Sequence, residues 1–88
     1  MYLFTEPVDE YDVDYFEVDI DSTVIQIQPE TANGMARLYY LLPEDLPNGA
    51  HTVIITAVNG WGSTPSDPFV FTKALPSKPS GIGLEQGA

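Results

Sequence analysis

The segment 51–59, HTVIITAVN, constrains the fold more than any other part of this chain. A period of two in such a β-branched run predicts a strand, because successive side chains leave opposite faces. Its odd-numbered positions form one face, and Ile54 and Val58 place apolar side chains on the other. We therefore expect a central strand of a sheet, with little solvent on either side.

Turn-forming residues border this strand at both ends. Pro47, Asn48 and Gly49 precede it, and proline presets φ while asparagine and glycine tolerate positive φ. Asn59-Gly60 follows it and is a strong signal for chain reversal. The sequence therefore predicts that the chain turns back after the strand and enters a second one at Phe69–Lys73.

Composition limits the class of protein. Eighty-eight residues allow one domain, and a hydrophobic content of 43% suits a folded chain. The absence of cysteine excludes disulfides and thiolate metal sites. A net charge of −10 argues against nucleic acid and against an anionic membrane surface, and no apolar run approaches the ~20 residues of a membrane span. High charge of this kind is typical of a soluble small domain.

The acidic segment 8–21 leads into a predicted hairpin. Its apolar residues change parity near Tyr15, so we expect a bulge or a switch from loop to strand there. Residues 16–20 then form a regular strand, Asp21-Ser22 a turn, and residues 23–28 a second strand with one wet face.

The middle of the chain is less regular. Residues 29–34, PETANG, are expected to be a loop, with a turn at Asn33-Gly34. Residues 35–42, MARLYYLL, are predicted to be a strand. A helix is the alternative, but the segment is short, has no clear N-cap and ends at Pro43.

The predicted core combines one face of each of these strands: Phe16, Val18, Ile20, Ile25, Ile27, Leu38, Tyr40, Val53, Ile55, Ala57, Phe69 and Phe71.

The pattern LPxGxHxVxIxAxN followed by WGxxxS in residues 46–66 resembles the last two strands of a fibronectin type III domain. The resemblance extends over residues 11–73. It implies an antiparallel β-sandwich, related to immunoglobulin folds, with five to seven strands and Greek-key connections. His51 stands where the family usually has a corner tyrosine. Residues 1–7 would belong to the family's second strand, with Phe4 near the usual buried tryptophan, so the first strand is either lacking or supplied again from elsewhere.

Residues 1–75 would form this domain, and residues 76–88 would form a proline- and glycine-rich tail. Residues 79–84 also resemble the start of a following domain of the same type. Two explanations stay open. The tail is a linker within a tandem array, or it adds the missing strand to its own sheet or to that of a neighbour.

Trp61 is the candidate ligand-binding residue, because an aromatic side chain in a glycine-rich loop suits a sugar or a peptide. The alternative is that it packs on the base of its loop. His51, the only histidine, lacks a nucleophile or a paired carboxylate placed by sequence. The acidic run lacks the spacing of a calcium loop, so solvated acids are expected rather than a metal site.

The function expected from these features is non-catalytic. By family resemblance, the chain would be a structural, spacer or adhesion module of a phage virion or an extracellular bacterial protein. Its partners would be neighbouring proteins or a tandem domain, with no cofactor, nucleic acid or membrane. The alternative is an accessory module that binds a polysaccharide or a peptide through Trp61 and the neighbouring loops.

Overall fold

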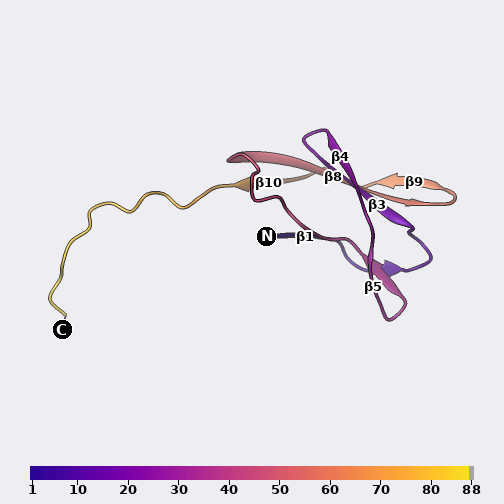
Figure 1. Cartoon of the computed structure of the whole chain (residues 1–88), viewed down its shortest axis with the longest axis horizontal. Coiled ribbons are helices and arrows are strands. Elements are labelled where there is room, and N and C mark those ends of the chain that lie inside the picture. Colours follow the sequence, from indigo (N-terminus) through magenta and orange to yellow (C-terminus); the bar gives the residue numbers. More distant parts are fainter. Residues whose placement is uncertain (88) are drawn as a thin grey trace.

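A computed structural model of the chain describes residues 1–87, and these form an all-β structure of antiparallel strand pairs with no helix (Figure 1). Ten strands follow one another in these residues: β1 (Tyr2–Phe4), β2 (Val8–Asp9), β3 (Tyr15–Ile20), β4 (Thr23–Ile27), β5 (Glu30–Ala32), β6 (Met35–Arg37), β7 (Tyr39–Leu41), β8 (Gly49–Asn59), β9 (Gly62–Pro65) and β10 (Phe69–Lys73). Nothing in this part of the chain has the length and helical form that a membrane-spanning helix requires.

The largest sheet has the order β10-β8-β3-β4. β9 also pairs with β8, along its second half, whereas β10 pairs with the first half. β8 is therefore central, as its two apolar faces predicted. Its register with β3 places Val18 opposite Ile55, and the register of β3 with β4 places Val18 opposite Ile25. One face of the sheet thus carries apolar residues in line across three strands.

The hairpin between β3 and β4 confirms the predicted turn at Asp21-Ser22. Both residues have positive φ, 50° and 74°. Two left-handed residues give the turn a twist that matches the strands it joins. Asp19 Oδ1 accepts a hydrogen bond of 2.7 Å from the Ser22 N–H, which supports this strained backbone.

Two small sheets contain the remaining strands. β1 pairs with β7, and β2, β6 and β5 form the other sheet. The predicted strand over residues 35–42 is interrupted at Leu38, because β6 and β7 pair with different partners. Thr5 fixes this break: its Oγ1 accepts from the Leu38 N–H at 2.9 Å. The predicted turn at Asn33-Gly34 is present, but part of the predicted loop around it is strand β5.

A single cluster of buried residues joins the large sheet to the small ones. Its members are Leu3, Val13, Phe16, Val18, Ile20, Ala36, Leu38, Leu42 and Val53. Six further predicted core residues are half-buried against it: Ile25, Ile27, Tyr40, Ile55, Ala57 and Phe71.

The core assignment of Phe69 was wrong, since this side chain is 55% exposed. It lies at the start of β10, the edge strand of the large sheet. The placement of Phe4 was also wrong. Phe4 is 66% exposed and its neighbour Leu3 is buried, because Leu3 pairs with Tyr40 on the inner face of β1 and β7.

The predicted change of parity near Tyr15 is present, because the buried positions switch from odd-numbered Val13 to even-numbered Phe16. Val13 is buried in the loop before β3, while Tyr11 is 86% exposed. The strand then begins at Tyr15 with Phe16 inward. Leu3, Ala36 and Leu42 also joined the core without having been predicted to do so.

After β10 the chain contains no strand through residue 87. Figure 1 shows this tail running away from the sheets, and the longest dimension of the molecule is 66 Å.

Candidate functional site

Trp61 lies at the tip of the β8–β9 hairpin, and its side chain is 98% exposed. The Asn59 side chain holds this turn in place. Its Oδ1 accepts a hydrogen bond from the Trp61 N–H at 2.8 Å, and its Nδ2 donates to the Asp12 carbonyl at 2.9 Å. The indole therefore projects into solvent from a backbone that is fixed at two points, and it does not pack on the base of its loop.

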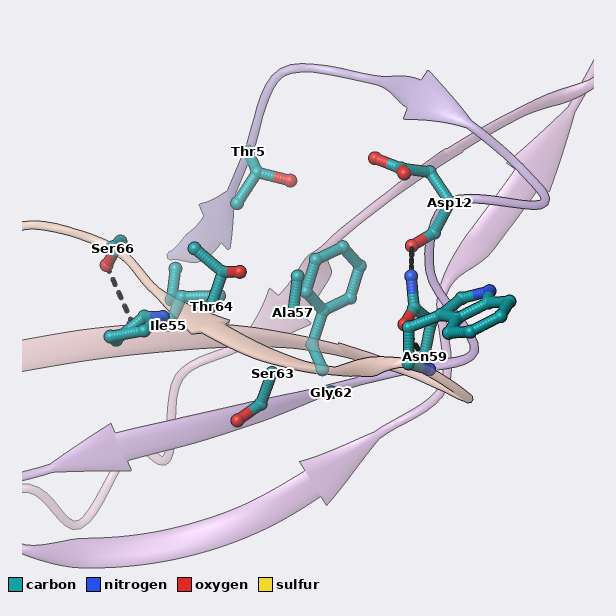
Figure 2. A pocket seen from close by; sticks show the side chains of 12 residues that line it. Thr5, Asp12, Ile55, Ala57, Asn59, Gly62, Ser63, Thr64 and Ser66 are labelled. Atoms are coloured by element: carbon teal, nitrogen blue, oxygen red, sulfur yellow. Dashed lines mark hydrogen bonds between the residues drawn. The ribbon is translucent and has the colours of Figure 1, made fainter.

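A groove of about 650 Å³ runs from Trp61 along the hairpin (Figure 2). Figure 2 shows Thr5 and Asp12 on one side, opposite Ala57 and Thr64 on the other. The N-terminal segment and the hairpin thus form its two walls, although they are far apart in the sequence.

The lining of this groove combines two kinds of surface. Phe16, Ile55 and Ala57 supply an apolar floor, whose members are buried or half-buried. The hydroxyl groups of Thr64 and Ser66 lie along β9 and just after it, whereas the Ser63 hydroxyl points away from Thr5 (Figure 2). Aromatic and aliphatic surface beside several hydroxyls and one carboxylate is the chemistry that holds a polyhydroxylated or peptide ligand.

Ser66 shapes the far end of the groove. The prolines at 65 and 68 have no N–H to donate, so the outer strand cannot pair continuously with β8 and divides into β9 and β10. Ser66 bridges the break: its N–H donates to the Ile55 carbonyl at 2.7 Å, and its Oγ accepts from the Ile55 N–H at 3.0 Å.

His51 lies away from this groove, at the start of β8, and is 5% exposed. Its Nδ1 is 2.5 Å from Asp21 Oδ2, and its Nε2 is 2.7 Å from the Pro47 carbonyl oxygen. Because the carboxylate and the carbonyl are both acceptors, both ring nitrogens must donate, which requires the imidazolium form.

The hydrogen bond to Asp21 raises the pKa of His51 above its usual 6.5, and the Pro47 carbonyl adds to this effect. In return, the hydrogen bonds from His51 and from the Thr52 backbone lower the pKa of Asp21 below 3.8. Both ring nitrogens of His51 thus contact groups that belong to the fold.

The acidic residues of segment 8–21 are spread over turns and strand faces. Asp9 accepts from the Tyr11 N–H at 2.9 Å, and Asp19 caps the β3–β4 turn. Within residues 1–87, no three acidic or histidine side chains converge as a metal site would require.

The structure brings together residues that the sequence left separate. Trp61 was proposed as a binding residue, and the groove adds Thr5, Asp12 and Asn59 to it. Asn59 could have been recognised from its place before Gly60, since asparagine accepts backbone hydrogen bonds in turns. Thr5 gave no such signal.

No family model, no curated protein and no solved structure shows significant similarity to this chain.

Proposed function

We propose that the chain is a non-catalytic module with a β-sandwich fold of the fibronectin type III kind, acting as a spacer or adhesion unit. The sheet order β10-β8-β3-β4 supports this, together with a small sheet of β1 and β7 whose inner residues share the same core. Such a pair of antiparallel layers around one core is the sandwich architecture.

The observation that carries the proposal is the corner before β8. His51 reaches back four residues to the Pro47 carbonyl, as the corner tyrosine of these sandwiches bonds to backbone a few residues upstream. The single histidine of the chain is therefore used to close a corner of the fold. A phage virion protein or an extracellular bacterial protein is the setting that the resemblance favours.

A second candidate function rests on the groove beside Trp61. An exposed indole on a rigid turn, beside a groove lined with hydroxyls, suits an accessory module that binds a polysaccharide or a peptide.

Tryptophan fluorescence distinguishes the two candidates, because Trp61 is the only tryptophan. Purified chain is titrated with a panel of soluble polysaccharides and peptides, and Thr64→Ala serves as the groove variant. The spacer proposal predicts unchanged emission throughout. A saturable change that Thr64→Ala weakens would favour the binding module and contradict a purely structural role.

A further inference from the structure

β1 has one free edge. β1 pairs with β7 on one side only, and within residues 1–87 no strand lies on its other side. The Leu42 N–H donates to the Met1 carbonyl, and the Thr5 N–H donates to the Leu38 carbonyl. Because backbone groups in an antiparallel pair alternate in direction, those of Tyr2 and Phe4 point to the free edge. An edge of this kind is a template for another strand.

A hollow of about 320 Å³ lies beside this edge, between β1 and the start of β10. We call it the β1 hollow. Its far wall includes Ile55, which is half-buried, and Phe69, which is 55% exposed, with Asp67 at the rim. The large sheet therefore presents an apolar face here that no described residue covers. A strand added to β1 would lie over it.

Residues 82–85 of the tail have the pattern that such a strand needs. Ile82 and Leu84 are two positions apart, so in an extended chain they leave the same face, and Gly83 between them leaves the other face bare. They are 87% and 105% exposed, which are extreme values for large apolar side chains. Strand addition takes its affinity from backbone hydrogen bonds and its specificity from pockets for alternate side chains.

The tail leaves β10 near β1 but leads away from its own sheets, and this course points to a second copy as the acceptor (Figure 1). β10 begins at Phe69 beside the β1 hollow and ends at Lys73, beside Met1. The Lys73 ammonium donates to the carbonyls of Glu44 and Leu46, which fixes the exit point at that end. Pro76 and Pro79 then favour an extended chain, and Figure 1 shows the tail leading away from its own sheets.

We propose that residues 82–85 of one copy pair with the free edge of β1 in a second copy. Ile82 and Leu84 then occupy the β1 hollow against Ile55 and Phe69. The donor and the acceptor are different surfaces, so the contact is head-to-tail and can continue from copy to copy. This inference does not depend on the module being a spacer or a ligand-binding unit.

Light scattering coupled to size-exclusion chromatography tests the proposal with the full chain. Mass should rise with protein concentration, because association follows mass action. Leu84→Asp should abolish the oligomers by placing a charge in an apolar hollow. Leu75→Asp is the matched control: it adds the same charge to an exposed leucine of the same tail, outside the donor segment, and should associate like the original chain.

Two outcomes would overturn the proposal. The chain could be monomeric at every accessible concentration, or Leu84→Asp could associate as well as Leu75→Asp. If the chain is monomeric and the Tyr2 and Phe4 amides are protected from hydrogen exchange until Leu84→Asp is introduced, the tail folds back on its own sheet. In support, a mixed sample of labelled and unlabelled chain should show intermolecular contacts between the Leu84 methyls and the Phe69 ring.

Discussion

His51 Nδ1 lies 2.5 Å from Asp21 Oδ2, and this contact joins the corner before β8 to the β3–β4 turn. The same carboxylate accepts the Thr52 N–H through its other oxygen at 2.9 Å. Thirty residues of sequence separate the two partners, and the pair connects adjacent strands of the large sheet at one end. Its charge state should therefore affect the stability of the whole fold.

The first prediction concerns pH. The pKa of His51 is raised in the folded state, so its ion pair adds stability. This stability is fully present below pH 6.5, the unfolded-state pKa, and is lost as the pH rises through the folded-state pKa. The pKa of Asp21 is lowered in the folded state, which also adds stability. This stability is present above pH 3.8, the unfolded-state pKa, and is lost as the pH falls through the folded-state pKa. The melting temperature, followed by circular dichroism, should therefore be highest between pH 3.8 and pH 6.5.

The control for this pH profile is Asp21→Asn. Without the carboxylate, the protein should melt at a lower temperature near pH 6, and its decline above pH 6.5 should be much shallower. If the variant and the original chain show parallel profiles, other groups control the pH dependence and the ion pair has no part in it.

The second prediction compares two large apolar residues of the predicted core. Leu38 is fully buried, so Leu38→Ala should cost about 2–5 kcal/mol of unfolding free energy through lost burial and a cavity. Phe69 is half-exposed, so Phe69→Ala should cost about 1 kcal/mol or less in the monomer. Urea melts of dilute protein measure both. Equal losses would contradict the placement of Phe69 outside the core.

The third prediction concerns Ser22, which has φ of 74° in the β3–β4 turn. Left-handed backbone is unfavourable for residues with a Cβ atom, and glycine adopts it freely. Ser22→Gly should keep the backbone hydrogen bond to Asp19 and raise stability by about 0.5–1 kcal/mol. A chemical denaturation curve shifted to lower urea would contradict the positive φ at this position.

The fourth prediction is that calcium does not contribute to stability. The acids of segment 8–21 serve turns and solvated faces, and no three of them converge within the described residues. The melting temperature should be the same with calcium and with an excess of EDTA. A rise of several degrees on adding calcium would show that the acidic segment binds an ion.

Local sequence patterns predicted which segments form strands and which form turns. The alternation in residues 51–59 predicted β8, and the parity change near Tyr15 predicted where β3 begins. The turn residues Asp21-Ser22 and Asn33-Gly34 marked their reversals correctly, since positive φ depends on local chemistry.

Features that depend on distant partners could not be predicted in this way. The break at Leu38 arises from Thr5, thirty-three residues upstream, and Phe69 is exposed on β10, which the strand order places at the edge of the large sheet. Likewise, the alternation of residues 69–73 shows which side chains share a face, but it cannot show whether another layer covers them. The groove beside Trp61 needed Thr5 and Asp12 from the N-terminal segment for the same reason.

The central claim is that the only histidine of the chain is a charged group that closes the corner at the start of β8 through Asp21 and Pro47. An NMR titration of His51 with ¹⁵N-labelled imidazole tests it most directly. The account predicts a pKa above 6.5, two protonated ring nitrogens at pH 6, and a return toward 6.5 in Asp21→Asn. A His51 that titrates below 6.5 in the folded chain, with one ring nitrogen unprotonated at pH 6, would contradict it.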